Sequence, residues 1–142
     1  MKRTIRFAIC VTGLLAIGAL GHVSAQQDGT ISDREMRLVD FEELVYPAPA
    51  QTAHQQGAVV VRVALDDQGK VLDTVAISGA KALIPDCLAN ARRWRFEPNA
   101  HKAAIIVYNF HLTRELSKLG CSHFSVRPPN FATITSCVLE VQ

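Results

Sequence analysis

The sequence lacks the short motifs with which many classes of enzyme do their chemistry. It contains no His-Glu-x-x-His zinc motif, no Gly-x-Ser-x-Gly nucleophile turn and no glycine-rich phosphate loop after a strand. Of the five histidines, the four beyond residue 25 are scattered rather than grouped like metal ligands: His54, His101, His111 and His123. Asp66 and Asp67 fall in a turn sequence, whose preference for aspartate explains them without catalysis. We therefore predict a protein that is not an enzyme and that carries no cofactor and no metal.

The chain also lacks a strong charge of either sign. It has 15 Lys and Arg against 13 Asp and Glu, and three of the basic residues lie in the first 25 positions with none of the acidic ones. The remainder has 12 basic and 13 acidic residues, a net charge of −1. A nucleic-acid surface is therefore not expected, and no small-molecule substrate is indicated. With 49% apolar residues, the chain of 142 suits one folded domain.

Long apolar runs are absent apart from one at the N-terminus. Three basic residues precede an apolar run of 14 residues, 7–20, and the small-residue site Val23-Ser24-Ala25 follows it. This order is typical of a secretory signal peptide, 1–25, with cleavage near Ala25. An uncleaved inner-membrane anchor is the alternative, but 14 residues fall short of the roughly 20 that cross a bilayer. We expect a periplasmic or secreted protein.

Cysteine is scarce, and its number becomes odd once the predicted signal peptide with Cys10 is removed. Cys87, Cys121 and Cys137 remain, so at most one internal disulfide forms. Cys121 and Cys137 flank one C-terminal excursion and are the expected pair, with a loop closure worth up to about 3 kcal/mol. Cys87 is expected in the core, although its pairing with either tail cysteine stays open. A zinc site of Cys121, His123 and Cys137, with or without Cys87, is a further alternative, but it has only one short ligand spacing.

A stretch of alternating apolar residues organises the middle of the chain. Every second residue from Val59 to Leu65 is branched and apolar, which predicts a strand with one apolar face. A turn follows, in which Gly69 supplies the positive φ of a tight hairpin, and leads into a second predicted strand, Val71–Ser78. On this second strand the residues expected to share a face are Val71, Val75 and Ile77.

Beyond Gly79 the apolar period becomes helical. Apolar residues recur at a spacing that predicts one helix packed across the sheet: Ile84, Cys87, Leu88, Ala91 and Trp94. Pro85 suits an early helical position, where an N–H would have no partner, and Pro98 is expected to help end the helix. Trp94 is expected in the core rather than as an exposed anchor for a partner.

The flanking segments complete an α+β fold. A short helix is predicted at 50–56, before Gly57, and a third long strand at 103–112. The three strands are expected to form an antiparallel sheet with the main helix on it.

The two ends of the mature chain are expected to lie outside this unit. Residues 26–40 are predicted to be a loose segment, and residues 36–45 fit either a short strand or a helical turn. The tail, 115–142, is predicted to hold two short strands around Pro128-Pro129-Asn130.

Several short motifs occur in order along residues 41–114. They are Tyr46-Pro47, Gly57, Asp66-x-x-Gly69, Ser78-Gly79 and Trp94-Arg95-Phe96-Glu97-Pro98. None is specific alone, but together, at this spacing, they resemble the TonB C-terminal domain family. The resemblance implies a non-enzymatic domain that pairs a sheet edge with the TonB-box segment of an outer-membrane transporter. The pairing edge that it implies here lies in the third strand, within 103–112: Ile105, Val107, Asn109 and His111.

Three features depart from a full energy transducer, which would transmit force from an inner-membrane motor. The N-terminal anchor of a transducer contacts the motor through polar residues, but here His22 has Gly18, not Ser, four residues before it. Only residues 26–33 are available as a spacer across the periplasm, and the tail strands could occupy the edge that the peptide would use. We therefore predict a TonB-like binding partner in TonB-dependent transport. The alternative is a stand-alone envelope scaffold whose edge strand pairs with itself or with another envelope protein.

Overall fold

The computed structural model describes residues 36–114 and 121–138. The predicted signal peptide, 1–25, lies outside the described residues, together with 26–35, 115–120 and 139–142. The described part of the chain forms these elements in order: β1 (Leu38–Asp40), α1 (Ala48–Thr52), β2 (Gly57–Leu65), β3 (Val71–Ser78), α2 (Ile84–Ala91), β4 (Arg95–Phe96), β5 (Ala103–Thr113), β6 (His123–Arg127) and β7 (Phe131–Cys137).

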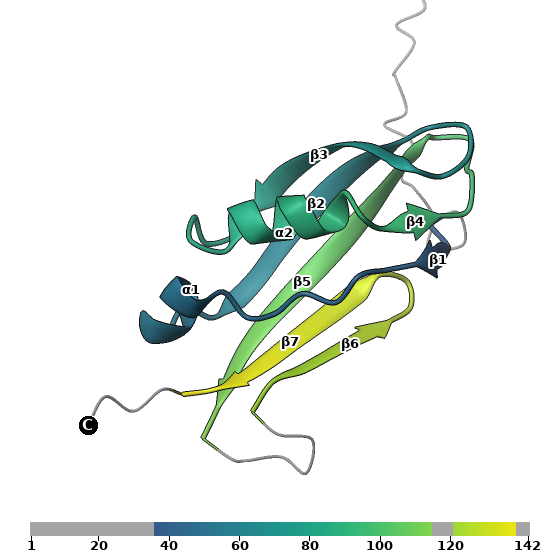
Figure 1. The fold of residues 1–142 in the computed structure, drawn as a ribbon. Helices are drawn as coiled ribbons and strands as arrows, with labels where there is room; N and C mark the ends of the chain where they lie inside the picture. The colour runs from purple at the N-terminus through teal and green to yellow at the C-terminus, as the bar shows by residue number, and fades with distance from the viewer. Residues whose placement is uncertain (1–35, 115–120, 139–142) are drawn as a thin grey trace, which may run out of the picture.

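Five of the strands form one mixed sheet in the order β3-β2-β5-β7-β6. All neighbours are antiparallel except β5 and β7, which run parallel. Figure 1 shows the long β5 in the middle of this sheet, with β3 at one edge and β6 at the other. β1 and β4 form a separate two-stranded sheet. The α+β class is therefore confirmed, and the predicted three-stranded antiparallel sheet is the β3-β2-β5 part of a larger one.

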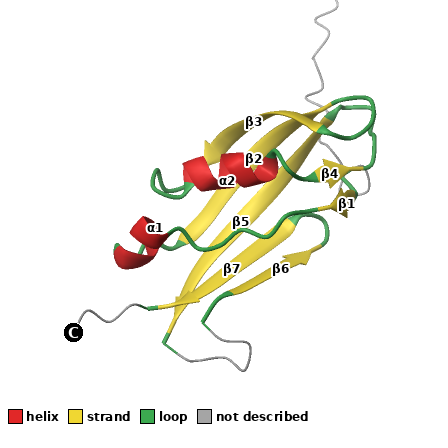
Figure 2. Cartoon of the chain, in the orientation of Figure 1, coloured by secondary structure: helices red, strands yellow, loops and turns green. Residues whose placement is uncertain are grey.

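Both helices lie on the same face of the sheet, as Figure 2 shows. α2 packs against β2 and β3. The segment that joins β1 to α1 crosses the same face of the sheet. The core lies between these layers, and its largest fully buried side chains are Trp94, Tyr108, Phe96, Phe110, Leu83, Ile106 and Ile134. The opposite face of the sheet carries no helix among the described residues.

β2 has the alternation that its sequence predicts. Val59, Val61 and Val63 have no exposed surface, and Leu65 is almost completely buried. Arg62, between them, is exposed on the helix-free face, because successive side chains of a strand point to opposite sides.

β3 departs from the predicted pattern because its pairing with β2 contains an extra residue. The register shifts between Ala64 and Leu65, so that Leu72 has no partner in the ladder, and it shifts again between Val60 and Val61, where Ile77 has none. An extra residue reverses which of the following side chains face the core. Val71 is buried, whereas Val75 and Ile77 are 56% and 58% exposed. The prediction that Val71, Val75 and Ile77 share a face is therefore wrong.

Both helices carry proline in the first turn. Pro47 is the N-cap of α1 and Pro49 lies just inside it, and Pro85 lies at the start of α2. Proline is tolerated there because the first N–H groups of a helix have no partner within it. α1 therefore begins at Ala48, before the helix predicted at 50–56.

α2 ends earlier than its apolar period predicts. Its last residue is Ala91, with Arg92 as C-cap, so Trp94 lies in the turn after the helix. Pro98 is farther along, beyond β4, and does not end α2, which corrects the predicted role. Trp94 has no exposed surface, so its predicted place in the core is confirmed.

The residues around β1 are part of the fold. Met36 is 7% exposed, and Leu38 pairs with Phe96 of β4. The prediction of a loose segment over 26–40 is therefore wrong for residues 36–40. β1 also decides the alternative that the sequence left open in favour of a short strand.

A buried asparagine side chain joins four parts of the fold. Asn90 lies on α2 and is 2% exposed. Its Oδ1 accepts hydrogen bonds from Trp94 Nε1–H at 2.8 Å and from the Tyr108 hydroxyl at 2.9 Å. Its Nδ2 donates to the carbonyl oxygens of Glu42 at 2.9 Å and Glu43 at 3.3 Å. These bonds fix α2, the turn after it, β5 and the β1–α1 segment relative to one another.

We expect Asn90→Ala to destabilise the predicted mature chain, residues 26–142, by about 3 kcal/mol or more, because it leaves buried donors and acceptors without a partner. Tyr108→Phe is the matched control, since it removes one hydroxyl and leaves Asn90 bonded to Trp94. It should cost about 1 kcal/mol. Urea denaturation followed by circular dichroism measures both losses. Equal losses in the two variants would show that the Asn90 amide does not join these elements.

Candidate functional site

The aromatic residues of the family-like motifs are core residues. Trp94 and Phe96 are buried, with ring centroids 6.3 Å apart. Tyr46 is also buried, its ring meets Phe110 edge-on at 5.2 Å, and its hydroxyl donates to the Gln55 carbonyl oxygen. Burial raises the pKa of the Tyr46 hydroxyl. These side chains build the domain and are not presented to a partner.

The remaining motif residues frame the strands and do not gather into one exposed site. Arg95 and Pro98 are exposed on and after β4. Gly57 opens β2, and Gly79 follows β3, where an added Cβ would lie 2.7 Å from Val59 Cγ2.

Gly69 closes the β2–β3 hairpin against β4. It has a φ of +78°, and its carbonyl oxygen accepts a hydrogen bond from Phe96 N–H at 2.9 Å. A Cβ on Gly69 would lie 1.8 Å from the Phe96 carbonyl oxygen, so no side chain fits. Asp66 holds the same turn, because its Oδ1 accepts from the amides of Gln68 and Lys70, both at 2.8 Å. These hydrogen bonds lower the pKa of Asp66.

The strand predicted to offer the pairing edge lies inside the sheet. β5 pairs with β2 on one side, and on the other side its residues Val107 to Thr113 pair with Phe131 to Cys137 of β7. The predicted pairing residues are Ile105, Val107, Asn109 and His111. Val107, Asn109 and His111 do not form an open edge, because β7 is already paired there as a parallel strand. Ile105 lies before this ladder, where its N–H donates to Met36 Sδ and its carbonyl oxygen accepts from Asn130 Nδ2.

Contacts at both ends hold β7 against β5. Where β7 begins, Asn130 Nδ2 donates to the carbonyl oxygens of Met36 at 3.0 Å and Ile105 at 3.2 Å. Where it ends, Gln51 Nε2 donates to the Cys137 carbonyl oxygen at 2.7 Å. The buried side chains of β7 are Ala132, Ile134 and Ser136. The tail is therefore an integral part of the sheet and shares its core.

The cysteines pair as predicted. A disulfide joins Cys121 to Cys137, with their Cα atoms 5.0 Å apart, and connects the start of β6 to the end of β7. This bond removes both thiolates that the zinc alternative would need. Cys87 is a free thiol with no exposed surface, so it does not pair with a tail cysteine. Burial, assisted by Asp86, raises the pKa of Cys87 to about 12.

Two outer edges of the five-stranded sheet remain open in the described part of the chain, those of β3 and β6. β3 carries three large apolar side chains that are more than half exposed: Leu72, Val75 and Ile77. Unpaired backbone groups on an apolar edge strand are a template for pairing with another chain. β6 is shorter than β3 and borders a cleft.

This cleft has a volume of about 370 Å³ and lies between the β1 region and the end of β6. The residues that line it are Met36, Arg37, Leu38, Phe41, Val126, Arg127, Pro128 and Pro129. Sequence reasoning missed it, because the residues at 36–41 and 126–129 come together only when the tail joins the sheet. The local sequence signal for this cleft is Arg127 followed by Pro128 and Pro129.

The chemistry that this arrangement supplies is backbone hydrogen bonding along open strand edges, with apolar and charged side chains beside them. Within residues 36–114 and 121–138, no three His, Cys, Asp or Glu side chains form a group that could hold a metal ion. In the same residues, no helix has the length and the apolar character needed to span a membrane.

A small mixed sheet with helices on one face and open strand edges belongs to the class of α+β domains that can take up an extended segment as a further strand. The family model for the C-terminal region of the Gram-negative bacterial TonB protein matches residues 42–112. The chain belongs to this family and is a TonB-like periplasmic protein. The family comprises non-enzymatic energy-transduction and binding domains that bind outer-membrane transporters.

The match has a clear boundary in the fold. It ends at residue 112, so β6 and β7 lie beyond the matched region. A comparison with curated proteins found no match.

Gly69→Ala is expected to destabilise the mature chain by about 3 kcal/mol or more, because the new Cβ collides with the Phe96 carbonyl oxygen at a positive φ. Gly57→Ala is the matched control. Gly57 also has a positive φ, +118°, but nothing lies within 4 Å of its added Cβ, so only backbone strain of about 1–3 kcal/mol is expected. The urea concentrations at the midpoints of unfolding measure both losses, provided that the slope of the unfolding free energy against urea is unchanged. If Gly57→Ala costs as much as Gly69→Ala, the close approach to β4 does not set the requirement for glycine.

The cysteine arrangement predicts the number of reactive thiols. Unfolded, unreduced mature chain should take one iodoacetamide label, on Cys87, and three after reduction. The folded chain should take none near pH 8, because its buried thiol has a pKa of about 12 and the thiolate, which is the nucleophile, forms only as the pH approaches that value. Intact-mass spectrometry counts the labels. A label on the folded chain at pH 8 would contradict the burial of Cys87.

Proposed function

We propose that this protein is a non-enzymatic binding protein of TonB-dependent outer-membrane transport, which adds an extended segment of a partner to an edge of its sheet. Its membership of the TonB C-terminal family, together with the open outer edges of β3 and β6, supports this proposal. The partner segment that the family resemblance indicates is the TonB box of a transporter. Cleavage of the predicted signal peptide near Ala25 would release the domain into the periplasm.

The occupied edge of β5 limits where a partner strand would bind. A segment that replaced β7 would break its parallel ladder with β5. It would also expose Ile134, whose burial is worth about 2 kcal/mol. Pairing at the outer edge of β3 or β6 requires neither loss, so an open edge is the favoured place.

A stand-alone envelope scaffold is the second candidate, and the occupied edge of β5 favours it. In this case the β3 strands of two copies would pair across a two-fold axis. The exposed side chains of Leu72, Val75 and Ile77 would then lie beside apolar side chains of the second copy across the new strand pair. Such a protein would hold envelope components together and would not transduce energy.

One experiment separates the two candidates. TonB-box peptides from the transporters of the same genome are titrated into the isotope-labelled mature chain, with a scrambled peptide as control. We expect saturable chemical-shift changes of backbone amides in β3 or β6 with the TonB-box peptides only. Sedimentation velocity of the free chain is recorded over the same concentrations. Concentration-dependent dimers with no peptide binding would favour the scaffold, and no binding by any TonB-box peptide would refute the transport role.

A further inference from the structure

The cleft beside β6 has the features of a preformed site for an extended chain. Its walls come from two segments that the fold brings together: residues 36–41 before α1, and residues 126–129 at the turn between β6 and β7. Figure 1 shows β6 running toward β1, so the cleft lies where this edge strand meets the β1–β4 sheet. An added strand along β6 would therefore run directly into the cleft.

The cleft walls are largely apolar and held in place. Phe41 is 42% exposed, although its ring packs beside those of Trp94 and Phe124. The centroid of the Phe41 ring lies 5.9 Å from that of Trp94 and 5.8 Å from that of Phe124. Leu38 and Val126 are partly buried against the core. An aromatic ring that is supported from behind and open in front can cover an incoming apolar side chain at little entropic cost.

The backbone beside the cleft offers hydrogen bonds over a short, defined length. β6 has β7 on its inner side and, among the described residues, no strand on its outer side. Pro128 and Pro129 follow β6, and proline has no N–H to donate. The open ladder is therefore limited to His123–Arg127, which suits a segment of about five residues.

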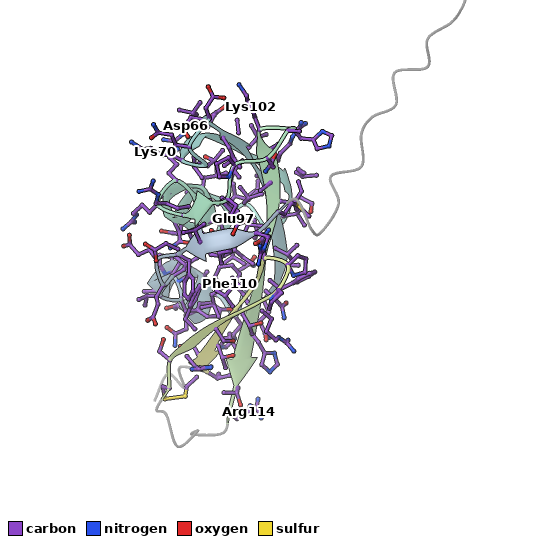
Figure 3. The ribbon with its side chains drawn as sticks, turned by 90° about the vertical axis from the view of Figure 1, so that its right-hand side faces the viewer. Asp66, Lys70, Glu97, Lys102, Phe110 and Arg114 are labelled. Atoms are coloured by element: carbon purple, nitrogen blue, oxygen red, sulfur yellow. A yellow bond between two sulfur atoms is a disulfide. The ribbon has the colours of Figure 1, made fainter. Side chains whose placement is uncertain are left out.

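Both charged residues that line the cleft are arginines, Arg37 and Arg127. In the described part of the chain, the Arg127 side chain makes no hydrogen bond or ion pair, and Arg37 has one exposed contact, 3.4 Å to Glu97. Figure 3 looks onto this end of the molecule and labels Glu97 beside β1. The mature chain has a net charge of −1 from 12 basic and 13 acidic residues. Thus the arginines are a local feature and not part of a generally basic surface.

We propose that the outer edge of β6 and this cleft bind an extended segment of a partner protein that carries apolar side chains and at least one carboxylate. The segment pairs with His123–Arg127 through its backbone, places apolar side chains against Phe41 and Leu38, and sets its carboxylate against Arg127. This rests on the proposed function, since it specifies which open edge takes the partner strand and which chemistry it selects.

The test uses the labelled mature chain and two blocked heptapeptides, one of alternating Val and Glu and one of alternating Val and Lys. We expect the Glu peptide to shift the amides of 123–127, with an affinity that falls as salt rises, and the Lys peptide to leave them unchanged. Arg127→Glu should weaken binding of the Glu peptide by roughly fivefold or more, because the attraction between Arg127 and the peptide carboxylates becomes a repulsion. Arg62→Glu, an exposed arginine on the helix-free face of β2, is the matched control and should leave the affinity unchanged.

Each remaining outcome overturns the inference. Equal binding of the two peptides, equal effects of the two arginine variants, or shifts confined to β3 would show that the cleft does not select the segment. Shifts of 123–127 that grow with protein concentration in the absence of peptide would assign the edge to a second copy of the chain.

The two proposals can fail separately. TonB-box peptides that bind at β3 while the Glu peptide does not bind would refute the cleft and leave the transport role in place. A Glu peptide that binds at β6 while no TonB-box peptide binds would leave the cleft in place and refute the transport role.

Discussion

The buried amide of Asn90 sets the arrangement on which the rest of the structure depends. An asparagine side chain offers two N–H donors and an oxygen with two lone pairs, and here all four are used. Burial raises the pKa of Tyr108, so its hydroxyl stays protonated, and able to donate to that amide, above the pH at which an exposed tyrosine ionises. Trp94, fixed by the same amide, supports the ring of Phe41. The cleft beside β6 therefore takes the position of its aromatic wall from a hydrogen-bond network in the core.

The tail changes what a domain of this family presents to the outside. Without β7, the long β5 would be an edge strand, which is the arrangement that the motifs of residues 41–114 led us to expect. With β7 in place, the side chains of Ala132 and Ile134 fill the core, and the exposed backbone moves outward to β6. β6 is short, is followed by two prolines, and is preceded by Cys121, which a disulfide joins to Cys137. The new edge therefore offers fewer backbone hydrogen bonds to a partner strand than the edge of β5 would.

Much of the fold could be predicted from the sequence, because the alternation of β2 and the helical period of α2 up to Ala91 are kept in the structure. The exposure of Val75 could not, since it depends on one unpaired residue in the β3 ladder, which no local pattern records. Trp94 was correctly placed in the core. The edge assigned to Val107 was wrong because strand neighbours are set by long-range pairing with the tail. The cleft was missed for the same reason.

The strand order has a consequence for how the molecule is assembled. β7 is the last of the described strands in the sequence but lies between β5 and β6 in the sheet, so β6 cannot join the sheet until β7 has paired with β5. A chain that emerges from its N-terminus can complete β3-β2-β5 while the far side of β5 is still bare. The final strand closes that side. A partly synthesised chain therefore exposes the edge of β5 that β7 covers in the complete sheet.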